Sequence, residues 1–249
     1  MYMAKEAGRN QTCTYFDNEY YIDGVKMVRF CDLSFVNHTF QELLTTIDKI
    51  NDVSPYNVHI SSLLSMLKTL DSRESTIAQH SFMVNRIAMA LGRVMKLPDQ
   101  EMLQLNWGTL LHDIGKLGIA DSILLKPAAL NTEEYQIIKR HPLVGYELVK
   151  NNEYLTSAGA VILCHHERWD GHGYPNNMQG NQIPLLARIC SVADTAAAMA
   201  EDRPYRKALP ITQIADELLR NAGTQFDPQI VEAFVTMPEK EKVILRSST

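Results

Sequence analysis

An adjacent histidine and aspartate interrupt an apolar stretch, LLHDIGKLGI, at residues 110–119. A lone carboxylate buried at the end of such a run is costly, so Asp113 needs a partner elsewhere in the chain. Other imidazoles and one more carboxylate stand at comparable places, near the ends of apolar helical runs. With His112 and Asp113 they form a set of five histidines and two aspartates: His80, His112, Asp113, His141, His165, His166 and Asp194.

Neutral imidazole and carboxylate groups are the ligands expected for divalent iron, manganese or zinc. Seven such ligands exceed what one ion can use while leaving room for substrate and water, whereas two ions sharing Asp113 would use all seven. Each residue alone could be a satisfied core residue. That simpler interpretation is sufficient for His38 and His59, and His172 is interpreted as an ordinary loop histidine.

The elements that must position these groups are predicted to be helices. From about residue 38 onward apolar residues recur at helical spacing, which predicts an all-α body of roughly eight to ten helices. Pro98 and Asp99 mark one helix start, and Asn131 to Glu134 has the spacing of a capping box. Alternating strand patterns are confined to the first 35 residues, as in QTCTYF and VKMVRF. The segment 167–184 is rich in glycine, proline and asparagine and predicts a long functional loop.

Composition restricts the kind of ligand and the compartment. The chain has 249 residues and a net charge of -5, so it offers no general attraction to nucleic acid or anionic lipid. A bound phosphate must therefore be held by a local cluster. Four scattered cysteines indicate neither a disulfide framework nor a zinc knuckle. The chain shows neither a signal-peptide core nor an 18-residue apolar run, so a cytoplasmic location is expected.

Several motifs, in order, resemble the HD-GYP family of the HD superfamily of phosphohydrolases. They are LLHDIGKLGI, HHERWDGHGYP at 165–175, VAD at 192–194, DRPYRKA at 202–208 and AGTQFDP at 222–228. The resemblance covers about residues 56 to 237 and implies the all-α helical bundle of the HD superfamily.

The resemblance also assigns roles to individual positions. It places the metal ligands on the seven residues named above and implies two divalent ions, iron or manganese. Asp113 and Lys116 would be catalytic, with Lys116 stabilising charge on the phosphoryl oxygens. The implied substrate contacts are Lys116, Gly173, Tyr174, Arg203 and Arg206. A solvated helix-end lysine and surface salt bridges remain the alternatives for Lys116 and for the two arginines.

The sequence departs from the family pattern at several places, among them Met83, where an arginine is common. Thr76 stands where some members have a carboxylate and bind a third metal, which favours two metals here. Ala196 and Ala197 replace the usual aromatic residue and aspartate, in a region that lines the substrate pocket in relatives. These alanines leave the seven ligands intact but bear on affinity and base preference.

The implied activity is hydrolysis of the second messenger cyclic di-GMP to pGpG, with further cleavage to GMP left open. One alternative is a non-hydrolytic sensor of cyclic dinucleotides, and another is the same enzyme acting on cyclic GMP-AMP. The expected partner is a cyclic dinucleotide, with no nucleic acid polymer and no membrane. A homodimer or a GGDEF-protein partner is left open.

The N-terminal segment MYMAKEAGRNQTCTYF resembles the C-terminal end of a GGDEF diguanylate cyclase domain. Only about 16 residues match, and the nucleotide-binding portion is absent, so no cyclase activity is expected. The alternative is an amphipathic helix that happens to end in GRN. We therefore expect a GGDEF-like remnant and connector over residues 1–35 and an HD-GYP domain over residues 36–249.

Overall fold

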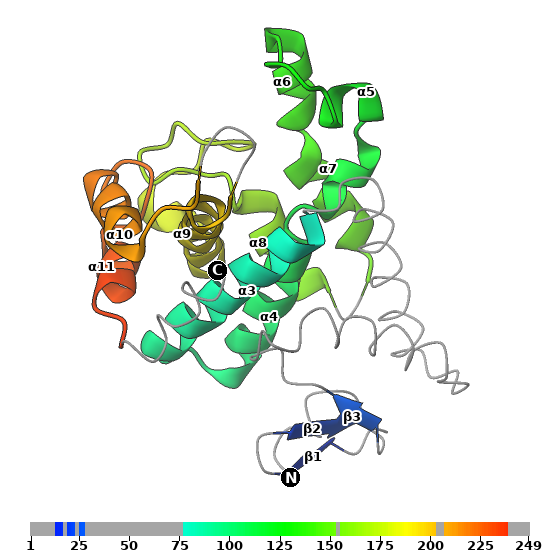
Figure 1. Ribbon diagram of the computed structural model, residues 1–249. Helices are drawn as coiled ribbons and strands as arrows, with labels where there is room; N and C mark the ends of the chain where they lie inside the picture. The colour runs from blue at the N-terminus through cyan, green and yellow to red at the C-terminus, as the bar shows by residue number, and fades with distance from the viewer. Residues whose placement is uncertain are drawn as a thin grey trace. The chain divides into compact units, whose positions relative to one another are not determined.

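The computed structural model describes residues 13–16, 19–22, 25–27, 77–152, 155–202 and 207–238 (Figure 1). The chain separates into two compact units, Met1–Asn51 and Asp52–Thr249. The predicted domain boundary at residues 35 and 36 stays a prediction.

The described part of the first unit is a three-stranded antiparallel sheet in the order β1-β2-β3. Its strands are β1 (Cys13–Phe16), β2 (Glu19–Ile22) and β3 (Val25–Met27), with Phe16 opposite Glu19 and Ile22 opposite Val25. Two of these strands fall inside the predicted segments QTCTYF and VKMVRF. The helix of the GGDEF-like segment lies outside the described residues, and that resemblance stays a prediction.

The regular elements in the described residues of the second unit are all helices, joined by loops, which confirms the all-α prediction. The first half contains α3 (Ile77–Val94), α4 (Asp99–Leu111), the 3-10 helix η3 (Ile114–Gly118), α5 (Asp121–Leu124), α6 (Thr132–Ile138) and α7 (His141–Val149). The second half contains η4 (Thr156–Ala158), α8 (Gly159–Cys164), η5 (Gly180–Gln182), α9 (Leu185–Ala200), α10 (Ile211–Arg220) and α11 (Pro228–Val235). None of the helices in these ranges is both long and apolar enough to cross a membrane.

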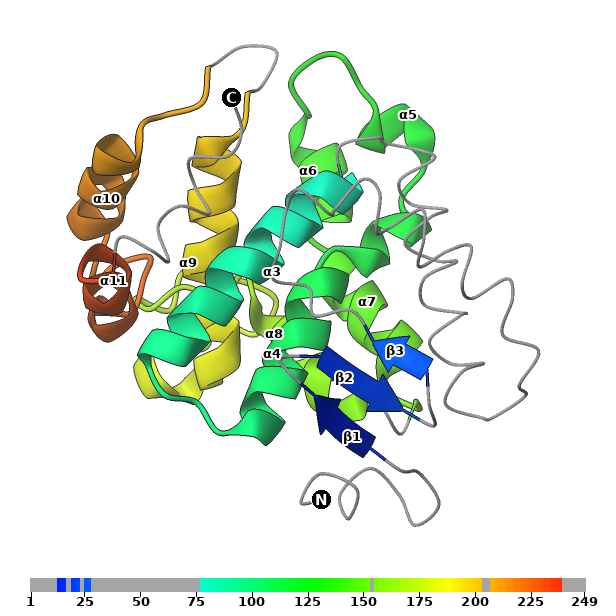
Figure 2. The ribbon, with the colours of Figure 1, turned by 60° about the horizontal axis from the view of Figure 1, so that its bottom comes forward.

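Helices α3 and α9 form the centre of the bundle and pack against each other, as Figure 2 shows in cyan and yellow. Helix α4 packs on α3, α8 packs on both α4 and α9, and α10 and α11 pack beside α9. The shared core consists of aliphatic side chains with almost no exposed surface: Val84, Ala88, Leu91, Leu105, Leu111, Val161, Ile189, Val192 and Ala193. Burying such side chains is the main stabilising contribution to the bundle.

The helix boundaries follow the predicted local signals. Helix α4 begins after Pro98, and Asn131 forms a complete capping box with Glu134 at the start of α6. Asp227 accepts a hydrogen bond from the backbone N–H of Gln229 at the start of α11, where proline is the first helical residue. These signals fix where the three helices begin. Most of the candidate ligands also stand at helix boundaries, after α4 and α8 and at the start of α7.

Candidate metal centre

The structure brings all seven predicted metal ligands together. His80 lies in α3 and Asp194 in α9, while His112 and Asp113 follow α4, His141 begins α7, and His165 and His166 follow α8. They form three overlapping groups in which the candidate ligand atoms lie within 4.8 Å of one another. The groups are His141, His165 and His166; His80, His112 and Asp194; and His112, Asp113 and His165.

Three of the histidines are oriented by the ends of helices. The Nδ1–H groups of His112, His141 and His165 each donate to the carbonyl oxygen three residues earlier, at a distance of 2.8 Å. Those carbonyls lie in the last turns of α4, α6 and α8, where no intrahelical N–H is available to them. The hydrogen bonds therefore complete the helix ends and fix the three imidazole rings at the same time.

This orientation leaves the Nε2 atoms as acceptors. A carbonyl can only accept, so each Nδ1 carries a proton, and Nε2 is the atom that presents a lone pair when the ring binds a metal. The Nε2 atoms of His141 and His165 lie 3.2 Å apart. Two lone pairs at this distance repel unless a cation lies with them. The donor arrangement therefore fits a metal ion, and a backbone carbonyl bonded to Nδ1 is the usual support of a ligating histidine.

Asp113 lies between the other donors. Its Oδ2 is 3.4 Å from Nε2 of His112 and 2.7 Å from Nζ of Lys116, and its Oδ1 is 3.3 Å from Nε2 of His141. Burial alone would raise the pKa of this carboxyl, but Lys116 and His112 outweigh that effect and hold it well below its usual range. The carboxylate is thus ionised at neutral pH, as a metal ligand must be.

His80 lies between two carboxylates. Its Nε2 is 2.9 Å from Oδ1 of Asp194, and its Nδ1 is 3.1 Å from Oε2 of Glu201. Burial would lower the pKa of His80, but the hydrogen bonds to Asp194 and Glu201 raise it to about 10. The pKa of Asp194 is held below its usual range, against the effect of burial, mainly by the hydrogen bond to His80. Glu201 was not predicted as a site residue, because only the fold brings it to His80.

Burial keeps the adjacent His165 and His166 neutral at physiological pH. Burial lowers the pKa of His166 to about 4, and burial together with His166 lowers the pKa of His165 well below its usual value. Neutral imidazoles and ionised carboxylates bind divalent ions, so a metal would displace the proton that the nearby carboxylates stabilise on His80 and on His112, whose pKa Asp113 raises against the effect of burial. Both the chemistry and the orientation of the donor set therefore fit a metal centre.

The loop that follows His166 packs closely against the centre. A Cβ on Gly173 would lie 2.3 Å from the backbone nitrogen of Arg168, so only glycine fits this position. The buried Glu167 carboxylate accepts hydrogen bonds from the backbone N–H groups of Asn176 and Met178. The ring of Tyr174 stacks on His166 with centroids 4.8 Å apart. The buried Gly173 thus has a packing role, and its substrate contact stays a prediction.

The other predicted positions have different outcomes. Lys116 lies at the centre beside Asp113, whereas Arg203, Arg206 and Thr76 lie outside the described residues. Ala196 and Ala197 are fully buried in the α9 helix of the core. Their side chains contact protein, which does not favour the idea that they shape base preference directly.

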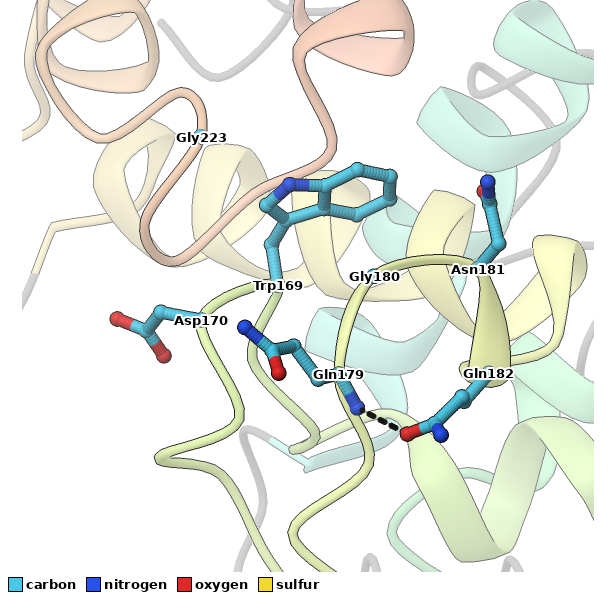
Figure 3. A pocket seen from close by; sticks show the side chains of 7 residues that line it. All are labelled: Trp169, Asp170, Gln179, Gly180, Asn181, Gln182 and Gly223. Carbon is cyan, nitrogen blue, oxygen red and sulfur yellow. Dashed lines mark hydrogen bonds between the residues drawn. The ribbon is translucent and has the colours of Figure 1, made fainter.

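A separate cavity of about 500 Å³ lies beside the loop that follows His166, where Trp169 and Gln179 line it (Figure 3). It is lined by Trp169, Asp170, Gln179, Gly180, Asn181, Gln182 and Gly223. None of the seven predicted ligands lines it. The candidate active site is therefore the cluster of histidines and aspartates described above, not this cavity.

The fold and the site together define a helical domain with a histidine and aspartate centre suited to divalent metals. The sequence profile of the HD domain matches residues 51–230, so the chain belongs to the HD domain family. This finding confirms the predicted superfamily and its helical fold.

Two relatives named as cyclic dinucleotide phosphodiesterases match most of this chain. The chain is 35% identical over 189 residues to a protein named cyclic di-GMP phosphodiesterase from Thermotoga maritima, covering 75% of this chain and 51% of the relative. It is 30% identical over 215 residues to 3'3'-cGAMP-specific phosphodiesterase 2 of Vibrio cholerae, covering 78% of this chain and 41% of the relative. The chain thus spans about half the length of these relatives or less.

A solved structure supports the same fold. The crystal structure of a cyclic GMP-AMP-specific phosphodiesterase of V. cholerae matches with a TM-score of 0.59 at 19% identity. The match covers 74% of this chain and 50% of that one. At this identity the similarity concerns the fold alone.

Proposed function

We propose that this chain is a metal-dependent phosphodiesterase that hydrolyses cyclic di-GMP to pGpG. The observation that carries the proposal is the convergence of five imidazoles and two carboxylates, whose candidate ligand atoms form groups within 4.8 Å of one another. The similarity to cyclic di-GMP phosphodiesterases supports the choice of substrate. Further cleavage of pGpG to GMP would use the same centre.

The proposed cofactor is a pair of divalent ions, iron or manganese. His80, His112 and Asp194 would hold one ion, and His141, His165 and His166 would hold the other. Asp113 would be shared, because its two oxygens face His112 and His141 on different sides. Bound divalent ions supply Lewis-acid stabilisation of phosphoryl oxygens and lower the pKa of water. This chemistry needs no nucleophilic side chain.

The protein's own groups would orient the reaction. Asp113 stays ionised, and the helix-end carbonyls bonded to Nδ1 keep the lone pairs of His112, His141 and His165 directed inward. Lys116 holds Oδ2 of Asp113 and brings a positive charge beside the centre. That charge would stabilise the negative charge that develops on the phosphate during cleavage.

The test measures bound metal and cyclic di-GMP turnover on one preparation of the protein. In Asp113→Ala we expect metal content to fall and turnover to drop by at least about 100-fold, because the shared ligand is lost. His172→Ala is the matched control, since the side chain of His172 is 83% exposed, lies beside Asp170 and belongs to none of the candidate ligand groups. Wild-type turnover in a metal-depleted Asp113→Ala protein would refute the proposal.

Cyclic GMP-AMP is the second candidate substrate. It is favoured by the similarity to the 3'3'-cGAMP-specific phosphodiesterase, not by the buried Ala196 and Ala197. Turnover of both dinucleotides under matched metal conditions decides between them, and a large preference for cyclic di-GMP rules out this candidate. A non-hydrolytic sensor is rejected if product accumulates steadily.

A homodimer or a GGDEF-protein partner would have a regulatory rather than a catalytic role. All seven proposed ligands come from one chain. The proposed reaction therefore requires neither kind of association.

A further inference from the structure

A lysine ammonium rests on two tyrosine rings close to the metal centre. Lys139 follows the last residue of α6, and its Nζ lies 4.8 Å from the centroid of Tyr174 and 5.5 Å from that of Tyr135. The Tyr174 ring in turn stacks on His166, a proposed metal ligand. A continuous series of contacts thus links the centre to this ammonium.

The position of Lys139 is tied to the centre through the backbone as well. It lies two residues before His141, whose Nδ1–H donates to the carbonyl oxygen of Ile138. The loop that carries Tyr174 is held by the buried Glu167. The rings reduce the freedom of a long, flexible side chain, because a cation is attracted to the face of an aromatic ring.

The ammonium is not neutralised by a carboxylate. Within the ranges that the structure describes, Lys139 makes no salt bridge, whereas the neighbouring lysines do. Lys126 pairs with Glu134, Lys150 with Glu147 and Lys116 with Asp113. A half-buried cation supported only by aromatic rings keeps its full charge for an anionic ligand.

A cyclic dinucleotide requires such a second cation. It carries two phosphodiesters in one ring, each with a negative charge, and only one can be cleaved at the metal centre at a time. Lys116 is already engaged at that centre by Asp113. The phosphate that is not being cleaved therefore needs positive charge at a separate point nearby, in addition to any contact with the predicted Arg203 and Arg206, which lie outside the described residues.

We propose that Lys139, held against Tyr135 and Tyr174, binds the phosphate of the cyclic dinucleotide that is not being cleaved. This inference rests on the proposed function and adds a substrate-positioning residue to it. The ammonium acts as a point charge and does not read the bases, so it should serve cyclic di-GMP and cyclic GMP-AMP equally.

The test removes the charge and keeps the aliphatic stem. In Lys139→Met we expect KM for both cyclic dinucleotides to rise by about tenfold or more, with kcat nearly unchanged, as for a lost charge-assisted hydrogen bond. Bis(p-nitrophenyl) phosphate has one phosphodiester and no base, so its kinetics should not change. Lys139→Arg should restore most of the affinity. Lys150→Met is the matched control, because Lys150 follows the last residue of α7 and forms a surface pair with Glu147.

Each other outcome overturns the inference. An unchanged KM for both dinucleotides excludes the contact, and a change for only one of them indicates base recognition instead. Equal changes for all three substrates indicate an indirect effect on the metal centre.

Failure of the proposed function would be recognised separately, because the wild-type protein would then turn over neither dinucleotide. In that case calorimetric binding of cyclic di-GMP to the wild-type and Lys139→Met proteins tests the phosphate contact. Affinity reduced about tenfold in the variant supports it, and equal affinity or no binding overturns it.

Discussion

Glu201 supports the candidate metal ligand His80 without being a candidate ligand itself. The Nε2 of His80 faces Asp194 and its Nδ1 faces Glu201, so one nitrogen is turned to the centre and the other to a supporting carboxylate. A carboxylate on the outer nitrogen fixes the ring and makes it a stronger donor.

Replacing that carboxylate should weaken metal binding without removing a ligand. In Glu201→Gln we expect the affinity for manganese to fall by about 10- to 100-fold, the usual effect of losing such a supporting group. Titration of the metal-free protein against a competing chelator measures the change. Glu217→Gln is the control, because among the described residues Glu217 pairs with Arg220 and Asn221 at the C-terminal end of α10. An affinity equal to that of the wild type would show that Glu201 does not support His80.

The sequence was informative about the ligands but not about their supporting residues. Histidine or aspartate at the end of an apolar helical run is visible in the sequence, and the structure brings all seven such residues together. Glu201 is 121 positions away from His80, and Lys139 meets Tyr174 only through the folded loop. Such pairings depend on the packing of helices, which a local pattern does not encode.

At the scale of elements, the centre depends on the close approach of η3 and α7. A Cβ on Gly115 would lie 1.9 Å from the carbonyl oxygen of His141 and 2.5 Å from the backbone nitrogen of Gly145. These are backbone atoms that cannot move aside independently. The glycine thus lets the segment carrying Asp113 and Lys116 lie against the helix that begins with His141.

Gly115→Ala should therefore separate two ligand-bearing elements. We expect the free energy of unfolding to fall by about 2 kcal/mol or more, as for overpacked sites, and metal content to fall with it. Thermal unfolding and metal analysis measure the two effects. Gly118→Ala in the same 3-10 helix is the control, since its Cβ would meet only Val144, at 3.1 Å. Equal stability of the two variants would mean that η3 can shift without cost.

The sequence predicts most of the helices and several of their start residues, but not how the helices pack against one another. The capping box at Asn131 and the proline before α4 gave correct helix starts, because caps act within one turn. Ala196 and Ala197 lie in a region that lines the substrate pocket in relatives, and the structure shows both fully buried in α9, so their effect on substrate preference stays a prediction. A small apolar residue on a helix gives no local sign of which neighbour will cover it.

At the scale of the whole unit, the seven proposed ligands come from helices spread along the sequence. His80 in α3 and Asp194 in α9 are 114 positions apart and meet at 2.9 Å. Bound ions would therefore link the central helices α3 and α9 with α4, α7 and α8. An ion that binds only the folded chain stabilises it by mass action.

Removal of metal should consequently lower the thermal stability of the protein. With metal at about 100 times its dissociation constant the gain is roughly 2.7 kcal/mol, which for a domain of this size corresponds to about 5 to 10 °C in Tm. Scanning calorimetry of the metal-loaded, chelated and reloaded protein measures the shift and its reversal. Asp113→Ala should show a much smaller difference between loaded and chelated forms, because the shared ligand is missing. A wild-type Tm that does not respond to chelation would indicate that the helices hold the cluster together without any contribution from metal.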